Sequence, residues 1–496
     1  MFNKKTDHPR GSKKLIGAWT WYDWANSVYS LVISSAIFPI YYSQYIFAQT
    51  NSVIIFNLEI NKDTLISSVS GFSFLIIAFL SPLLSGIADY TGNKKIFMKF
   101  FVYMGSISCL GLYWFELETI EISLVFYVLA LIGYWGSLVY YNSYLTDITY
   151  PKQTNMVSAR GFAMGYIGSV SLLLVNLIMI NYYESFGFTS EINAMKLSFA
   201  IVGVWWLGFS QYSFYHLPKG IPTGNKVKRH VIFNGIKELK IVWKSLTHNL
   251  RLKRFLNAFF VYSMAVQTIM LVATYFGEQE INWGSESEKT MGLIVSILII
   301  QIVAVFGAIL TSRSSAKFGN INTLIGINMV WMSLCFYGYF VETPVQFYIT
   351  ASLVGFVMGG IQSLSRSTYS KFLPETDDTT SYFSFYDVAE KITSLMKVPI
   401  GLISQTVFPK IVKEKSLSFI NKIYCNGFAK LPVGKVRYGL MLREDGLVMD
   451  DGTTARMSEN HFIMTTTTVN AESVYRHLEF CHQCRSKLSS HLPLQA

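Results

Sequence analysis

The chain has 496 residues, of which 51% are hydrophobic and only 14% are charged, and its mean hydropathy is +0.35. Soluble domains carry roughly 25% charged residues, so this composition excludes an ordinary soluble protein and predicts an all-α polytopic membrane protein. The formal net charge of +11 is explained by basic loops on one side of a membrane. We therefore expect no nucleic-acid partner.

The first apolar stretch follows a basic N-terminus and contains an acid, Asp23. It is too long for a cleaved secretory signal and shows no small-residue cleavage site, so we expect a membrane helix. A charge at the bilayer centre costs about 2.5 to 3.5 kcal/mol on insertion scales, and such acids usually face a cavity or a partner. The alternative is a residue near the helix end whose charged group snorkels to the interface.

Eleven apolar stretches approach the length of about 20 residues that a spanning helix needs. The last of them is interrupted by charged residues, and no apolar stretch for a twelfth helix follows it. The predicted spans are approximately 16–47, 65–89, 96–115, 122–146, 157–181, 196–216, 252–277, 290–312, 321–340, 346–371 and 382–408.

The loops between these stretches alternate in charge. Because Lys and Arg accumulate on the cytoplasmic side, the basic loops predict a cytoplasmic N-terminus. The basic residues on that side are Lys94, Lys95, Lys99, Lys152, Arg160, Arg313 and Lys317. The opposite loops are acidic or sparse in charge, with Glu59, Asp63, Glu116, Glu118, Glu121, Glu184, Glu191, Glu278, Glu280, Glu286 and Glu288.

The longest polar connection, residues 217–250, predicts a basic cytoplasmic linker between two halves. Glu238 is its single acid, and apolar residues from Ile232 to Leu246 recur at helical spacing with lysines beside them. This pattern predicts an amphipathic helix on the membrane surface, in contact with lipid. A regulatory or partner-binding role is the alternative. The predicted domains are residues 1–216, a six-helix half; 217–250, the linker; 251–408, an incomplete second half; and 409–496, a soluble fragment.

Three short segments of the first half have weak counterparts in the second half. They pair Tyr22–Asn26 with Tyr262–Val266, Gly92–Asn93 with Gly319–Asn320, and Tyr144–Asp147 with Phe372–Glu375. All three pairs fall on equivalent helices at similar long offsets. Internal repeats of this kind are typical of transporters built from two related halves.

The segment Ser85–Lys95, SGIADYTGNKK, resembles the loop between helices two and three of the major facilitator superfamily. Glycine permits a tight reversal there, and the acid can accept charge-assisted hydrogen bonds. Ser85 replaces the family's usual first glycine and Asn93 a common arginine, which weakens the salt-bridge part of the gate. The second copy, Ala316–Asn320, lacks the acid, so we expect the gating charge in the first half. The predicted gate residues are Asp89, Gly92, Asn93, Lys94 and Lys95.

Four further segments carry a closer resemblance to a bacterial branch of major facilitators related to the vacuolar amino-acid effluxer of autophagy. They are Trp21–Ser27, Tyr141–Ser143, Val157–Tyr166 and Gly359–Ser367, and the resemblance covers residues 15–391. It implies a twelve-helix fold, alternating access, and a substrate that is an amino acid or a similar small metabolite. We expect a secondary active transporter in the bacterial inner membrane, acting as a monomer with a proton as a candidate coupling ion.

The candidate pathway residues are Asp23, Asn26, Ser27, Tyr22, Gln267, Thr268, Arg160 and Arg366. Asp23 is expected to bind a substrate ammonium or a coupling proton, and Gln267 and Thr268 are its seventh-span counterparts. Arg160, Arg366 and Lys391 are candidate counter-charges; the alternative for the two arginines is contact with lipid phosphate at the cytoplasmic end. The nearby aromatic residues either stack on a substrate or form an interfacial belt, and they are Trp19, Trp21, Trp24 and Tyr22.

The tail predicts short strands separated by turns, a small meander. Phe428–Gly446 and Val448–Thr454 resemble the folate-binding part of the sarcosine oxidase alpha subunit, which is similar to the glycine-cleavage aminomethyltransferase. In that family an aspartate like Asp450 or Asp451 contacts the folate. The matching piece is short, so we expect no cofactor and no enzyme activity. The alternative is a membrane-anchored folate-dependent aminomethyltransferase or sarcosine oxidase-like fusion.

Two unrelated sequences joined in mid-helix predict a fused, frameshifted or misassembled reading frame, with a natural fusion as the alternative. The tail lies outside if the eleventh span inserts and in the cytoplasm if it does not. Cys481–Cys484 with His477 and Cys425 suggests a metal or redox site. No second ligand pair has the usual spacing, so we expect no metal.

Overall fold

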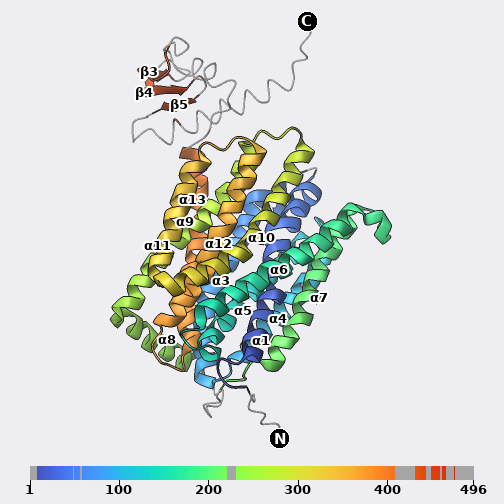
Figure 1. The fold of residues 1–496 in the computed structure, drawn as a ribbon. Coiled ribbons are helices and arrows are strands. Elements are labelled where there is room, and N and C mark those ends of the chain that lie inside the picture. The colour runs from blue at the N-terminus through green and yellow to red at the C-terminus, as the bar shows by residue number, and fades with distance from the viewer. Residues whose placement is uncertain are drawn as a thin grey trace. The chain divides into compact units, whose positions relative to one another are not determined.

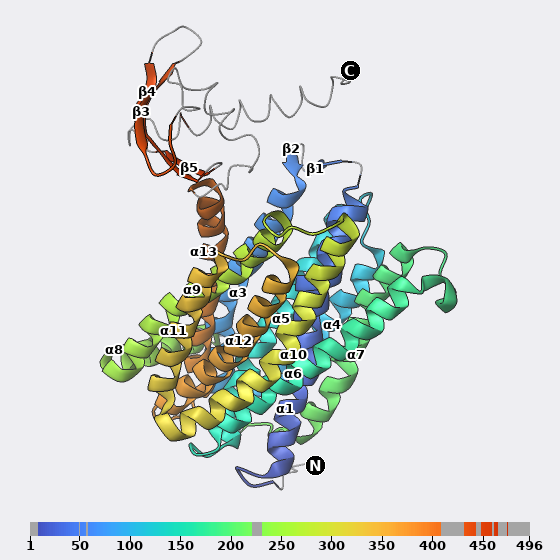
Figure 2. The same cartoon turned by 45° about the horizontal axis from the view of Figure 1, so that its top comes forward.

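The computed structural model describes residues 8–48, 50–55, 58–220, 231–407, 431–442, 448–458, 461–464 and 474. The chain forms two compact units, Met1–Gly401 and Leu402–Ala496. The fold class is confirmed: the first unit is a bundle of long helices that lie side by side in both views (Figure 1, Figure 2), and the second contains short strands.

The first half of the bundle begins with α1 (Lys13–Val28). Its other long helices are α3 (Lys62–Thr91), α4 (Lys94–Gly111), α5 (Ile120–Ile148), α6 (Thr154–Asn181) and α7 (Glu191–His216). The second half contains α9 (Leu250–Gln279), α10 (Glu286–Phe318), α11 (Asn320–Gly338), α12 (Pro344–Phe372) and α13 (Thr379–Val407). All eleven predicted stretches are therefore helical. Among the described residues, 8 helices are long and apolar enough to cross a membrane, namely α3, α4, α5, α6, α7, α10, α11 and α12.

The first predicted span is helical but irregular. After α1 the chain continues through a π-helical segment η1 (Tyr29–Ala36), a short α2 (Ile37–Ile40) and a second π-helical segment η2 (Tyr41–Ile46). Pro39 lies inside α2; proline lacks an N–H, and its ring clashes with the carbonyl four residues earlier. π-Helical turns accommodate such interruptions and are frequent at functional sites.

Two short elements lie on the connections of the bundle. A β-hairpin of β1 (Ser52–Ile55) and β2 (Leu58–Asn61) precedes α3, and the sequence pattern did not predict it. The predicted amphipathic helix is present as α8 (Val231–His248). Val242 and Leu246 of α8 join the hydrophobic core of the second half, whereas Trp243 is 59% exposed.

Each half has its own hydrophobic core. One buried cluster runs through α1 to α7, and the other runs through α8, α9, α11, α12 and the start of α13. The contacts between halves include many hydrogen bonds, described below. Two separate cores agree with the two-half organisation that the repeats predicted, because each half can then move as a body.

The second unit contains three described strands, β3 (Val436–Leu442), β4 (Val448–Ser458) and β5 (His461–Met464). They pair antiparallel in the order β3-β4-β5, which confirms the predicted meander. Asp450 is buried in β4, and Asp451 accepts a hydrogen bond from the Tyr438 hydroxyl. The Cys481–Cys484 cluster lies outside the described residues.

Candidate functional site

A buried ion pair joins the two halves. Asp23 lies on α1 and Arg366 on α12, and Arg366 Nη2 is 3.4 Å from Asp23 Oδ2. Asp23 is only 5% exposed and Arg366 only 3%. Their positions are far apart in the sequence and come from different halves, so the predicted counter-charge role of Arg366 agrees with the geometry. A buried arginine of this kind is not available to lipid phosphate.

Both charged groups have further polar partners. Asp23 Oδ2 accepts a hydrogen bond of 2.6 Å from the Tyr141 hydroxyl. Arg366 donates from Nε to the Ser158 hydroxyl and from Nη2 to the Ser158 carbonyl, each at 3.0 Å, and from Nη1 to Asn142 Oδ1 at 3.2 Å. A guanidinium has five N–H donors in a fixed fork, and this pocket supplies acceptors on several of its sides. The pair is therefore held in one arrangement.

Aromatic rings surround the guanidinium. Its carbon lies 4.1 Å from the Phe162 ring centroid, 4.7 Å from that of Trp19 and 5.5 Å from that of Tyr141. The negative faces of such rings stabilise a cation. Trp19 is fully buried and donates to the Tyr141 carbonyl, so the interfacial-belt interpretation is wrong for Trp19. Its indole belongs to the charged pocket.

A glycine lets the two halves approach at this point. A Cβ on Gly161 of α6 would lie 2.5 Å from Asp23 Oδ2 and 2.9 Å from Arg366 Nη2. On the same helix, a Cβ on Gly165 would collide with the Ser27 hydroxyl. Glycine is required where another group comes this close to the backbone. The α6 surface is thus shaped around the polar face of α1.

The other predicted residues of α1 lie beside the pair. Asn26 is 1% exposed, and its Nδ2 has no hydrogen-bond partner among the described residues. The Ser27 hydroxyl donates to Asn26 Oδ1 at 3.4 Å. Tyr22 is fully buried, with its ring centroid 4.8 Å from that of Tyr141. Tyr22 therefore supports the pocket from within the first half and does not belong to an interfacial belt.

The structure does not gather every predicted residue around Asp23. Gln267 and Thr268 lie half-buried on α9, and within the described chain neither makes a hydrogen bond to the polar residues of α1. Arg160 is exposed, with no carboxylate within 4 Å in the described regions, so it does not act as a counter-charge in this state. Lys391 is buried but pairs with Asp387 on its own helix. Neither residue pairs with Asp23 in this structure, so their role as counter-charges stays a prediction.

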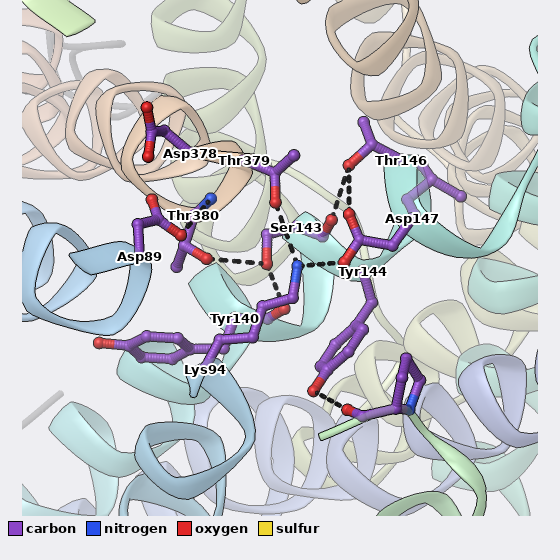
Figure 3. Close-up of polar contacts among 12 residues, drawn as sticks. Asp89, Lys94, Tyr140, Ser143, Tyr144, Thr146, Asp147, Asp378, Thr379 and Thr380 are labelled. Atoms are coloured by element: carbon purple, nitrogen blue, oxygen red, sulfur yellow. Dashed lines mark hydrogen bonds and ion pairs between the residues drawn. The ribbon is translucent and has the colours of Figure 1, made fainter. Parts of the chain in front are cut away.

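The predicted gate loop also connects the halves (Figure 3). Asp89, at the end of α3, accepts a hydrogen bond of 3.3 Å from the backbone N–H group of Thr380 (Figure 3). It also accepts one of 2.6 Å from the backbone N–H group of Ser381. These N–H groups open α13 and have no partners within that helix. The partial positive charge at a helix N-terminus stabilises a carboxylate. Asp89 of one half thus caps a helix of the other.

Lys94 completes this contact. Its ammonium lies 2.5 Å from Asp147 Oδ2 and donates to the Thr379 hydroxyl at 3.1 Å (Figure 3). Lys95 donates to the Leu217 carbonyl at 2.6 Å, within the first half. Gly92 ends α3 with φ 64°, and the Asn93 side chain makes no cap. The gate loop therefore acts through Asp89 and Lys94, while Gly92 sets the turn.

The segment before α13 carries one more titratable group at the gate. Asp378 lies between α12 and α13 and receives a hydrogen bond from the Thr376 hydroxyl at 3.5 Å. Burial and the neighbouring Asp377 carboxylate raise the pKa of Asp378, and the Thr376 bond opposes this rise. The charge at this corner of the gate therefore responds to pH at a higher value than a solvated aspartate does.

Further hydrogen bonds join the halves on the same side of the bundle. Asn155 Nδ2 donates at 2.7 Å to both Ser315 Oγ and Asn320 Oδ1, and the Ser158 hydroxyl donates to the Ser363 carbonyl at 2.8 Å. These residues lie near the start of α6, at the end of α10, at the start of α11 and, for Ser363, within α12. Together with the gate loop, they seal the end of the bundle that holds the start of α1.

Sequence reasoning missed most of the partners that complete this site. Tyr141, Asn142 and Ser158 lie in segments that carried the family resemblance, but no role was assigned to them. Thr380 and Ser381 contribute backbone N–H groups, which any residue can supply. Their roles depend on which helices face each other, and hydrophobic periodicity within one helix does not contain that information.

Comparisons with known families and proteins identify two parts of the chain. A family model described as "Vacuole effluxer Atg22 like" matches residues 11–407. An MFS-type transporter YxiO of Bacillus subtilis is 34% identical over 381 residues, which are 76% of this chain and 85% of that protein. Autophagy-related protein 22 of Kluyveromyces lactis is 22% identical over 457 residues, 80% of this chain and 89% of the relative.

Solved structures of similar fold are transporters. FucP, a major facilitator superfamily transporter in the outward conformation, superposes with a TM-score of 0.57 at 14% identity, over 79% of this chain and 91% of FucP. The human organic anion transporter MFSD10 gives a TM-score of 0.56 at 9% identity, over 80% and 94% of the two chains. Identities this low establish the fold and nothing finer.

The tail matches a different kind of protein. A model described as "GCVT N-terminal domain" matches residues 384–491. The sarcosine oxidase alpha subunit of Rhizobium meliloti is 61% identical over 74 residues, which are 15% of this chain but only 8% of that protein. Both predicted resemblances are confirmed, and the tail corresponds to a small piece of the enzyme subunit.

Proposed function

Because this chain belongs to the Atg22-like family of major facilitator transporters, we propose that it is a secondary active transporter of a small solute, with amino acids as the substrate class. The observation that carries the proposal is the buried Asp23–Arg366 pair between the halves. An intramembrane ion pair of this kind usually marks a substrate or ion pathway. The bacterial inner membrane, with the N-terminus in the cytoplasm, is part of the proposal.

An amino acid has the charges to replace this internal pair. Its ammonium group is complementary to the Asp23 carboxylate, and its carboxylate is complementary to the Arg366 guanidinium, which binds planar anions in a bidentate manner. Substrate entry would exchange one ion pair between the halves for two ion pairs with the solute. The charge balance of the pocket stays the same, so the exchange avoids leaving an unpaired buried charge.

The same exchange supplies a mechanism for alternating access. In the present arrangement the start of α1 lies on the sealed side, and Asp89, Lys94 and Asn155 connect the halves there. We propose that this is the state closed toward the cytoplasm. When a solute separates Asp23 from Arg366, the gate contacts remain as the last connection and must break before the cytoplasmic side opens.

The test is uptake of labelled amino acids into proteoliposomes that contain the full chain. Asp23→Asn should abolish transport without preventing membrane insertion, because the amide keeps the shape but cannot pair with an ammonium. Glu116→Gln is the matched control, because Glu116 pairs with Lys196 at 2.5 Å on the exposed surface of the first half. Unchanged flux in Asp23→Asn would remove Asp23 from the mechanism.

A membrane-anchored folate-dependent enzyme remains the second candidate, because the tail resembles an enzyme subunit. The tail corresponds to 8% of the sarcosine oxidase subunit, so we propose that it has no catalytic activity. Titration of the full chain with tetrahydrofolate tests this point. Saturable binding that Asp450→Asn abolishes would support the enzyme alternative, and no binding would support a transporter with an inactive appendage.

A further inference from the structure

A pocket opens at the sealed end of the second half. Its volume is about 320 Å³, and it lies where the start of α9, the ends of α10 and α12 and the start of α11 meet. All of its lining residues belong to the second half. The pocket is therefore separate from the Asp23–Arg366 pair and from the gate loop.

Two cationic side chains line this pocket, Arg251 at the start of α9 and Lys371 in the last turn of α12. In the described parts of the chain, neither has a carboxylate within 4 Å. The acids that follow α12, Glu375 and Asp377, therefore do not neutralise them. The pocket presents two positive charges without a counter-ion from the described protein, so it is suited to an anion.

An aromatic ring supports one of the two cations. The guanidinium carbon of Arg251 lies 4.0 Å from the centroid of the Phe372 ring, which also lines the pocket. Such a contact stabilises the cation through the face of the ring. The N–H donors point outward in the plane of the guanidinium, where they can bind a phosphate in a bidentate manner.

The start of α11 adds backbone donors to the same pocket. Gly319, with φ 85°, joins α10 to α11 and has no side chain to cap the helix. The N–H groups of Asn320, Ile321 and Asn322 therefore have no acceptor within the helix. All three residues line the pocket, and a free helix N-terminus favours a phosphate. It adds to the attraction that the two cations exert.

The pocket also has an apolar rim. Phe318 and Ile321 line it and are 60% and 43% exposed. A phospholipid matches both parts, because its phosphate can meet the cations while its glycerol and acyl chains meet the rim. A free phosphate would leave the rim without a partner. Anionic lipids are also abundant in the cytoplasmic leaflet, which the proposed orientation places at this end of the bundle.

One lining residue connects the pocket to the contact between the halves. Asn320 Oδ1 accepts a hydrogen bond of 2.7 Å from Asn155 of the first half. Asn320 Nδ2 donates to Asn155 Oδ1 at 3.1 Å and to the Thr368 hydroxyl of α12 at 2.9 Å. A ligand that holds the start of α11 therefore also holds the residue that pairs with the first half.

We propose that this pocket binds the phosphate group of an anionic membrane lipid and that the bound lipid stabilises the state closed toward the cytoplasm. The inference goes beyond the transport of a solute, and its assignment to the cytoplasmic side rests on the proposed function. The lipid shifts the equilibrium only as far as it binds the closed state more tightly. By reciprocity, closure of the halves through Asn320 strengthens lipid binding by the same factor.

The first test measures binding. The full chain in detergent is titrated with phosphatidylglycerol, and the bound lipid is counted by native mass spectrometry. Arg251→Gln/Lys371→Gln should lower the affinity at least about tenfold, because each nearby cation attracts the anionic lipid. Arg251→Lys/Lys371→Arg keeps both charges and reports on folding, so it should retain binding. Equal affinity of the native chain and the glutamine variant would overturn the proposal.

Lys253→Gln/Arg254→Gln is the matched control. It removes the same charge from two exposed residues of α9 that do not line the pocket. Its affinity for phosphatidylglycerol should equal that of the native chain. A loss as large as that of the pocket variant would assign binding to the general positive charge of this surface, and the pocket would have no specific role.

Spin-label distances across the sealed side test the effect on closure. Phosphatidylglycerol in phosphatidylcholine nanodiscs should increase the closed population of the native chain but not that of Arg251→Gln/Lys371→Gln. Asn320→Ala should still bind the lipid but lose most of this increase, because its contact with Asn155 is gone. An increase that persists in Asn320→Ala, or no increase in the native chain, would overturn the coupling.

Inorganic phosphate added to pure phosphatidylcholine nanodiscs distinguishes a lipid from a soluble anion. It should leave the closed population unchanged, and an increase equal to that caused by phosphatidylglycerol would overturn the lipid assignment. None of these measurements needs a transported solute. Absence of amino-acid uptake with an intact lipid effect would therefore count against the proposed function alone.

Discussion

The Asp23–Arg366 pair and the Asp387–Glu390–Lys391 cluster both place charged groups inside the helical unit, but these groups come from different elements. The first joins one acid to one base across the two halves, and Tyr141, Ser158 and Asn142 satisfy both groups. The second places two acids around one base on a single helix.

This difference indicates the role of the Asp23–Arg366 pair. A balanced pair cannot lose either partner alone without leaving the other charge buried and unpaired. A solute that brings both signs of charge can replace both partners of this pair at once. We therefore propose substrate exchange at the Asp23–Arg366 pair.

Removal of one partner of the Asp23–Arg366 pair should have the largest effect on transport and on thermal stability. Arg366→Gln leaves the Asp23 carboxylate buried without its cation, which costs about 3 to 5 kcal/mol in typical buried pairs. Transport should be lost and the thermal transition lowered, as measured by uptake and by thermal unfolding in detergent. A thermal unfolding temperature equal to that of the native chain would show that the Asp23–Arg366 pair does not stabilise the fold.

The double variant Asp23→Asn/Arg366→Gln sharpens the same comparison. It removes both charges, so most of the lost stability should return, because neither group is then left unpaired. Transport should remain absent, because neither end of a zwitterionic solute can bind. Recovery of transport together with stability would show that the pair holds the halves together without contacting the solute.

Gly161→Ala should have the next largest effect, because it separates the pair without changing any charge. The added Cβ would lie 2.5 Å from Asp23 Oδ2, and overpacking of this kind typically costs about 1 to 3 kcal/mol. Gly208→Ala on α7 is the control, because a Cβ there meets nothing within 4 Å and alanine favours the helix. Equal uptake by the two variants would argue against close packing of α6 on the pair.

Comparison of the sequence with the structure shows which features the sequence predicts and which it does not. Hydrophobic length located the helices, and the excess of basic residues located the linker, because both signals lie within single segments. Arg160 and Arg366 looked equivalent in the sequence, yet only Arg366 faces Asp23. That distinction depends on the rotation of each helix and on its neighbours. The β1–β2 hairpin was missed because its strands are only 4 residues long.

Variants of Asp89 test the contact between the halves at the gate loop, away from the two buried charge sites. Loss of a helix-capping side chain costs about 0.5 to 2 kcal/mol. A loss of about 1 kcal/mol in Asp89→Ala should lower the population of the closed state relative to the open state about fivefold. Asp89→Asn should have a smaller effect, because the amide oxygen still accepts a hydrogen bond. Spin-label distances across the sealed side would measure the shift, with Asp63→Asn at the opposite end of α3 as the control.

The smallest effect should come from the Glu116–Lys196 pair, although its N–O distance of 2.5 Å is shorter than the 3.4 Å between Arg366 and Asp23. The Glu116 side chain is 51% exposed, and surface ion pairs contribute about 0.2 to 1 kcal/mol because water solvates the separated charges. Glu116→Gln should therefore leave uptake unchanged and shift the thermal transition only slightly. If Glu116→Gln lost as much transport and stability as Arg366→Gln, the N–O distance would determine how much an ion pair contributes. We expect burial to determine this contribution, because only a buried charge must find its counter-ion within the protein or in the solute that it carries.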